Sequence, residues 1–174
     1  MEVIWTHFPL HPETPEEGRS LEDLFRGRNY DLKASQARLS ALMAEEGLPY
    51  APARTHTYNS RLAQELGKWA VTQPGGEAIH DALFRAYFVE TVNIGRIDEL
   101  VRIVGETGLD TDSAREVLDT RSFRAAVDSD WRRAGELGIS GVPTFVSNNL
   151  GVGGAQPYEI LVRLVEKARE QRQD

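Results

Sequence analysis

Short stretches of β-type sequence lie near both ends of this chain, and a long block of helical sequence separates them. Residues 2–8 (Glu-Val-Ile-Trp-Thr-His-Phe) are rich in β-branched and aromatic types and predict a short strand. The prolines at positions 9, 12 and 15 then predict an extended loop, because proline donates no hydrogen bond to a ladder. β-type sequence returns only at 143–147 and 151–154, where it predicts a two-stranded hairpin. This order of elements indicates an α/β protein.

The block between these segments predicts helices, because its apolar residues recur every three or four positions. Ser20 is a candidate N-cap for a short helix, and Asp23 lies three positions on, as in a capping box. We expect further helices at 31–46, 59–72, 76–92, 97–106, 111–119 and 121–137. A last helix is expected to begin near Pro157, a residue favoured in a first turn. Its buried stripe would consist of Ile160, Leu161, Leu164, Val165 and Ala168.

Length and charge limit the classes of partner. The 174 residues are enough for one domain, or for a small domain that carries an insertion. The formal charge of −7 argues against a nucleic-acid partner, because binding to phosphates needs a basic face. No apolar run approaches the ~20 residues that span a bilayer, so we expect no membrane partner. The N-terminus lacks the basic start and long apolar stretch of a signal peptide, so a cytoplasmic location is expected.

The chain contains no cysteine, which excludes disulfides, zinc–thiolate sites and cysteine nucleophiles among these residues. Four histidines remain as candidates for metal or proton chemistry. His7 and His11 flank Pro9 in an extended loop, where they share no face, and we expect no metal there. We expect His56 in a loop and His80 on the surface of a helix. We therefore assign no catalytic residue, no metal ligand and no cofactor.

A proline stands at the mouth of the predicted hairpin. Gly138-Ile139-Ser140 forms a glycine-containing turn before it, and Gly141-Val142-Pro143-Thr144-Phe145 begins the first strand. Gly151, Gly153 and Gly154 lack the spacing of a phosphate-binding loop, so we expect them to serve the hairpin and a close backbone approach. The segment Gly141–Phe145 resembles the proline loop of thioredoxin-fold proteins, in which the proline faces a reactive thiol.

Several further motifs carry a resemblance to the DsbA family, and to its FrnE-type branch in particular. They are Trp5-Thr6-His7-Phe8-Pro9-Leu10-His11-Pro12, Ala82-Leu83-Phe84-Arg85-Ala86-Tyr87-Phe88, Asn93-Ile94-Gly95, Gly108-Leu109-Asp110 and Gly153-Gly154-Ala155-Gln156-Pro157. The resemblance implies a thioredoxin-like fold, incomplete at the N-terminus, with an all-helical insertion domain. Residues 1–19 and 138–174 would form the thioredoxin-like domain. Residues 20–137 would form the insertion, with the end of its last helix returning to the thioredoxin-like part.

The chain departs from the family pattern at its start. Members of the family begin with a strand and a helix opened by Cys-x-x-Cys, and only then reach the strand that matches Trp5–Phe8. Such a strand–helix unit takes about 30 residues, and we expect it to be missing here. Removing a middle strand would leave a gap of two strand spacings, each about 4.8 Å. Either 2–8 then pairs directly with 143–147, or it remains an unpaired edge. We expect a destabilised chain, a homodimer or a fragment of a longer gene.

The resemblance also implies where substrates bind and what the lineage does. Val142, Pro143 and Thr144 would form the substrate-binding loop, with a cis bond before Pro143; the alternative is a trans proline that begins an edge strand. The lineage chemistry is thiol–disulfide oxidoreduction or isomerisation, which needs sulfur, so this chain is expected to be redox-inert. One alternative is a non-catalytic module that holds a peptide or a small apolar ligand at the proline loop, as a possible homodimer. Another is a relative of the kappa glutathione transferases and hydroxychromene carboxylate isomerases, which would bind glutathione.

Overall fold

The computed structural model describes residues 3–52 and 54–171. Two compact units divide the chain: Met1–Leu10 together with Asp128–Asp174, and His11–Val127. The domains expected at 1–19 with 138–174 and at 20–137 stay a prediction, because compactness alone does not identify a domain boundary. Among the described residues, no helix combines the length and the apolar character that crossing a bilayer requires.

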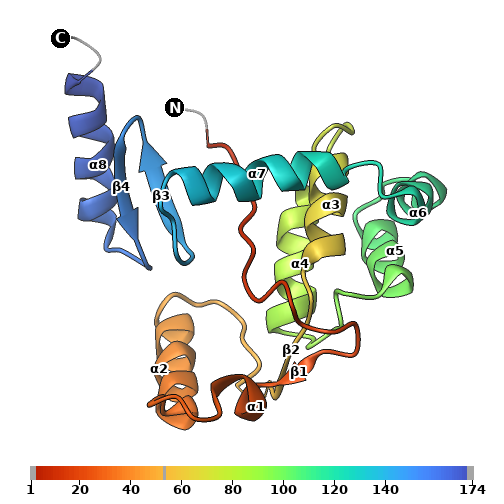
Figure 1. Ribbon diagram of the computed structural model, residues 1–174, viewed down its shortest axis with the longest axis horizontal. Coiled ribbons are helices and arrows are strands. Elements are labelled where there is room, and N and C mark those ends of the chain that lie inside the picture. Colours follow the sequence, from red (N-terminus) through yellow and green to blue (C-terminus); the bar gives the residue numbers. More distant parts are fainter. Residues whose placement is uncertain (1–2, 53, 172–174) are drawn as a thin grey trace. The chain divides into compact units, whose positions relative to one another are not determined.

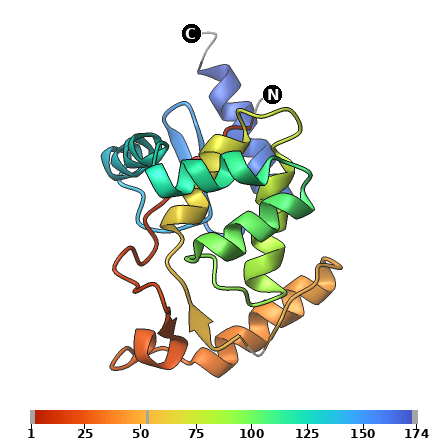
Figure 2. The same cartoon turned by 90° about the vertical axis from the view of Figure 1, so that its right-hand side faces the viewer.

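The regular structure of the unit His11–Val127 is mainly helical (Figures 1 and 2). Its helices are α1 (Leu21–Phe25), α2 (Leu32–Glu45), α3 (Arg61–Ala70), α4 (Ala78–Phe88), α5 (Ile97–Glu106) and α6 (Thr111–Thr120), followed by the first residues of α7 (Arg124–Glu136). Two short strands, β1 (Arg19–Ser20) and β2 (His56–Thr57), pair antiparallel, with Ser20 opposite His56. His56 therefore lies in a strand and not in the expected loop, because two residues are too few for an alternating pattern to reveal a strand.

The core of this unit lies where α3, α4, α5 and α6 meet. α5 packs against both α4 and α6, and α3 packs against α6 as well. Most of the largest fully buried apolar side chains come from these four helices, and Val127 of α7 adds to them; the members from α3 to α6 are Leu66, Ile79, Leu100, Ile103, Val104 and Leu118. The helical spacing that predicted these elements is thus the spacing that places one face of each helix in the core.

Local capping fixes where several of these helices begin. Ser20 Oγ accepts a hydrogen bond from the Asp23 N–H at 3.0 Å, which confirms the predicted N-cap. Asp110 caps α6 in the same way. The helix expected at 121–137 begins only at Arg124, because Arg121 adopts a left-handed conformation (φ 56°) that ends α6.

The other unit is built on a hairpin and a helix. β3 (Thr144–Ser147) pairs antiparallel with β4 (Leu150–Gly153), so the predicted hairpin is confirmed. α8 (Tyr158–Glu170) packs against both strands and follows Pro157, as expected. Within its predicted apolar stripe, Leu164 and Ala168 are buried, and the other members are half-buried. The turn residue Asn148 joins hairpin to helix, because its Nδ2 donates to the Ala168 carbonyl at 2.6 Å.

The strand predicted at 2–8 is wrong for residues 3–8, and residue 2 lies outside the described residues. Residues 3–8 belong to no ladder, and within the described chain β3 pairs only with β4. Of the two arrangements considered, direct pairing with 143–147 is therefore not formed. The segment is held by a hydrogen bond from the His7 backbone N–H to Asp130 Oδ2 of α7, at 2.9 Å. β-branched composition indicates a fit to a pleated surface, and no neighbouring strand supplies that surface here.

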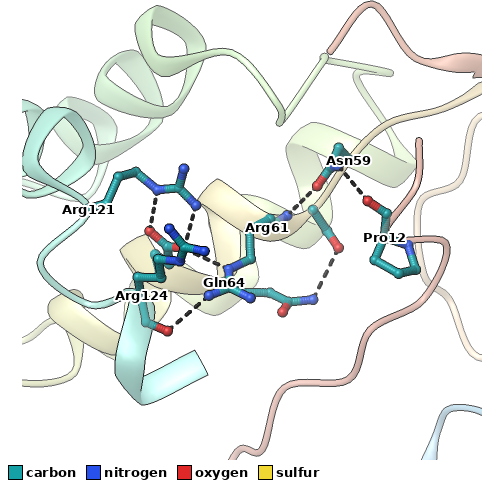
Figure 3. A network of polar contacts seen from close by, with 8 residues as sticks. Pro12, Asn59, Arg61, Gln64, Arg121 and Arg124 are labelled. Atoms are coloured by element: carbon teal, nitrogen blue, oxygen red, sulfur yellow. Dashed lines mark hydrogen bonds and ion pairs between the residues drawn. The ribbon is translucent and has the colours of Figure 1, made fainter. Parts of the chain in front are cut away.

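A buried carboxylate links α3 to the junction between α6 and α7. Glu65 is fully buried, and both of its oxygens accept hydrogen bonds. Arg61 Nε donates to Oε1 at 2.6 Å, while Arg121 donates to both oxygens at 2.7 Å each. Arg61 also donates to the Arg124 carbonyl at 2.9 Å (Figure 3). Burial alone raises the pKa of Glu65, but the hydrogen bonds from Arg121 and Arg61 outweigh it and hold that pKa below its ordinary value of 4.5.

This cluster makes the stability of the protein sensitive to acid. Because the pKa of Glu65 is lower in the folded chain, its stabilising effect is present above the unfolded value of 4.5 and is lost as the pH falls through the lower folded value. We therefore expect the free energy of unfolding to fall as the pH drops from about 4.5 toward the lower pKa of folded Glu65. The variant Glu65→Gln, which has no carboxyl group at this position, should show a shallower fall. Denaturant unfolding at a series of pH values measures both slopes, and equal slopes would contradict the assignment.

Candidate functional site

A pocket of about 430 Å³ lies in the unit built on the hairpin. It is lined by the turn after α7, the proline loop, one face of β3, the hairpin turn and all of β4; these residues are Leu137–Val142, Thr144, Val146 and Asn148–Gly154. We call this surface the loop–hairpin site. It contains the predicted Val142 and Thr144, and Pro143 lies between them in the same loop.

The strand faces explain why a hollow exists here. Thr144 and Val146 line the pocket, whereas Phe145 between them does not, so the pocket lies on one face of β3. The residues opposite them on β4 are Gly153 and Gly151. A Cβ atom at Gly153 would meet its nearest neighbour, Thr144 Oγ1, at 3.8 Å, which is an ordinary contact. Gly151 and Gly153 thus place no side chain opposite Val146 and Thr144, although Leu150 and Val152 of β4 also line the pocket.

The proline loop is fixed on both sides of Val142. The peptide bond between Val142 and Pro143 is cis, the isomer that the resemblance implies. The Gly154 N–H donates to the Pro143 carbonyl at 2.7 Å, and Thr144 Oγ1 donates to the Gly141 carbonyl, also at 2.7 Å. Thr144 thus positions the loop through its hydroxyl group.

Val142 presents unused hydrogen-bonding groups. Its side chain is 50% exposed, and within residues 3–52 and 54–171 nothing hydrogen-bonds to its backbone N–H or C=O. Backbone groups of this kind need a partner when they are covered. β3 adds to this surface, because in the described chain only one of its two edges is paired. The loop and the open strand edge together offer a row of backbone groups to an incoming chain.

The site is electrically neutral. No residue from Leu137 to Tyr158 carries a charge, although 27% of the whole chain is charged. Such depletion of charge is typical of the central part of a binding surface. Elsewhere, His80 is half-buried, and burial lowers its pKa below 6.5. Among the described residues, no three His, Asp or Glu side chains are placed to hold a metal ion.

Sequence reasoning missed two parts of this site. It named the loop residues but not the glycine face of β4, and it did not include Leu137 after α7. Gly151 and Gly153 alternate with Leu150 and Val152, so the period of a strand already placed both glycines on one face. That spacing was the available signal, but only the pairing of β4 with β3 shows which residues the glycines lie opposite.

The loop–hairpin unit thus combines a cis proline, a two-stranded hairpin and a covering helix. The model of the DSBA-like thioredoxin domain matches residues 1–166, and the chain belongs to this family. The protein YwbO of Bacillus subtilis (strain 168) is 25% identical over 173 residues, which are 99% of this chain and 84% of that protein. The predicted fold class and the oxidoreductase lineage are thereby confirmed.

Two solved structures are similar. The crystal structure of the probable DsbA oxidoreductase SCO1869 from Streptomyces coelicolor has a TM-score of 0.83 and 28% identity, and the match covers 91% of this chain and 71% of that one. A candidate protein disulfide isomerase from Nitrosomonas europaea has a TM-score of 0.61 over 78% of this chain and 72% of that one. At 17% identity it shows the fold alone. The FrnE-type branch and the missing strand–helix unit stay predictions.

Proposed function

We propose that the loop–hairpin site binds a neutral, extended peptide segment, and that these 174 residues hold it without thiol exchange of their own. The observation that carries this proposal is the exposed Val142, whose backbone N–H and C=O are unused beside the open edge of β3. An extended peptide forms its main-chain hydrogen bonds with such groups and places alternate side chains in neighbouring pockets.

The chemistry of the pocket favours small apolar side chains on that peptide. Val146 contributes a branched apolar group, and the glycine face of β4 leaves room above it. A charged side chain would lose water without gaining a partner, because no residue between Leu137 and Tyr158 is charged. The peptide therefore binds through backbone pairing and apolar contact.

Thiol–disulfide exchange proceeds by attack of a thiolate on a disulfide sulfur. The chain contains no cysteine, so its own residues supply no such nucleophile. In an insulin-reduction assay with dithiothreitol we expect the same rate with the purified chain as without it. An increased rate would contradict the redox-inert assignment. It would not bear on peptide binding, which the affinity measurement below tests.

Filling the glycine face should remove peptide binding. The variant Gly153→Val places a side chain in the hollow, and a strand accepts a β-branched residue readily. We expect the affinity for a labelled neutral peptide of alternating valine and threonine to fall by about tenfold or more, because overpacking of this kind costs about 1–3 kcal/mol. Fluorescence anisotropy measures this affinity.

The matched control is Gly135→Val, which adds the same side chain to an exposed glycine of α7 outside the pocket, with no atom within 4 Å of the new Cβ. It should bind the peptide as the wild type does. Equal affinity in wild type and Gly153→Val, or an equal loss in both variants, would place the peptide elsewhere. Binding of small apolar molecules in place of the peptide would favour the ligand alternative.

A further inference from the structure

α2 is a helix without a buried side chain. None of its 14 residues is buried, and Leu39 and Leu42 remain 38% and 45% exposed. Figure 1 shows α2 beside α1, with which it packs. By comparison, the ten-residue α3 and α5 bury six and three residues. A helix of this length is marginal in water unless an apolar face is packed, so the face of α2 lacks the cover that would stabilise it.

The uncovered face can be located on the helix. Ser35 and Gln36 lie on the same side of the helix as Leu39, and there the side is covered by the chain itself, since Gln36 Nε2 donates to the Arg54 carbonyl at 2.8 Å and Ser35 contacts the Tyr30 hydroxyl. The uncovered part is the continuation of this side toward the C-terminal end, with Leu39 and Leu42. Leu39 and Leu42 lie three positions apart, and therefore on one side of the helix. Leu32 precedes Leu39 by seven residues, which is the repeat of helices that pair side by side.

The C-terminal end of α2 carries a charge that its dipole disfavours, whereas at the N-terminal end the acidic cap Asp31 accepts a hydrogen bond from the Ala34 N–H. Lys33 lies in the first turn and Glu45 at the last residue, and the helix has no acidic residue in its first turn and no basic one in its last. α8 shows the usual order, with Glu159 in the first turn and Lys167 in the last. Negative groups are favoured at the N-terminal end of a helix and positive groups at the C-terminal end. A second copy of α2 laid antiparallel would bring the basic Arg38 of one helix beside the acidic Glu45 of the other.

We propose that α2 is a self-association surface, on which a second copy of this chain lays its own α2 antiparallel about a twofold axis. In this pairing Leu39 of each copy packs against Leu42 of the other, and Arg38 of each copy lies opposite Glu45 of the other. One alignment of the two antiparallel helices produces both the leucine contact and the ion pair, because Arg38 directly precedes Leu39 and Glu45 follows Leu42 by three residues. Neither Arg38 nor Glu45 has an ion-pair partner within the described residues, so both are available for this contact.

The interface is small. A helix of 14 residues is about 21 Å long, so the pair buries less than the ~1,200 Å² of a standard stable interface. The dimer is therefore weak, and its formation depends on concentration and on salt. The surface belongs to the unit His11–Val127 and shares no residue with the loop–hairpin site, so the two proposals stand or fall separately.

A charge-swap experiment tests the pairing. Sedimentation equilibrium is run on the full chain, from low micromolar to several hundred micromolar, for wild type, Arg38→Glu, Glu45→Arg and an equal mixture of the two variants. Each variant alone replaces two attractive pairs by two repulsive ones, and we expect its dimerisation to weaken about tenfold. The mixture restores both attractions in a heterodimer and should associate as strongly as the wild type. Circular dichroism establishes that each variant is folded.

Two controls make the outcome decisive. Arg132→Glu changes the net charge by the same amount as Arg38→Glu at an exposed position of α7, outside α2, and it should leave dimerisation unchanged. Leu42→Glu should abolish dimerisation. A wild type that stays monomeric over the whole range overturns the proposal. A dimer that resists both Leu42→Glu and Arg38→Glu overturns it as well, and so does a mixture that fails to recover.

Discussion

Replacing Leu66 by alanine is expected to destabilise the helical unit by about 3–5 kcal/mol. Leu66 lies on α3 with no exposed surface, in the cluster that α3 shares with α4, α5 and α6. Truncation removes the apolar contacts of this side chain and leaves a cavity that four packed helices fill only in part. Urea unfolding measures the change, and hydrogen exchange of the α3 and α5 amides assigns it to this unit.

The matched control is Val71→Ala at the end of the same helix. Val71 is 45% exposed, so its truncation should change the free energy of unfolding by no more than about 0.5 kcal/mol. If Leu66→Ala cost no more than Val71→Ala, the four helices would not share the core described here.

The variant Glu65→Ala should cost about 2–4 kcal/mol for a different reason. It leaves the guanidinium groups of Arg61 and Arg121 without the carboxylate that both contact. Breaking a buried ion pair by removing one partner costs about 3–5 kcal/mol. The expected loss is lower than this general range, because the Arg121 side chain is 40% exposed and can be hydrated when the carboxylate is removed. Thermal unfolding followed by circular dichroism measures the loss.

Glu106→Ala provides the comparison for Glu65→Ala. Glu106 also pairs with an arginine, Arg102, but both side chains are largely exposed. Exposed pairs contribute about 0–1 kcal/mol, so this variant should change stability little. Equal losses in the two variants would mean that burial adds nothing to the Glu65 cluster.

The helices were predictable because one period determines both their pattern and their packing. The helix at 97–106 lies where the spacing of its apolar residues placed it, and Ser20 caps α1 as its hydroxyl predicts. Helix boundaries differed from the prediction where the backbone conformation ends a helix within an apolar pattern. Arg121 is an example, because its left-handed φ separates α6 from α7. The spacing of apolar residues does not predict a left-handed backbone conformation at a residue such as Arg121.

The β elements were harder to predict, because a strand needs a neighbour. Residues 3–8 have the composition of a strand and form none, whereas His56–Thr57 pair with Arg19–Ser20 in stretches too short to show alternation. For the site, the resemblance named the loop from Val142 to Thr144. The open face opposite Thr144 and Val146 emerged only when the register of the hairpin was known.

The most direct test of the binding account is an NMR titration of the isotope-labelled chain with the neutral valine–threonine peptide. We predict that the largest amide shifts fall on the proline loop, β3 and the glycine face, and that the Val142 amide gains protection from exchange when the peptide is bound. Shifts centred on α3 to α6, or no shifts at concentrations that saturate a weak peptide site, would show that this surface does not hold an extended chain.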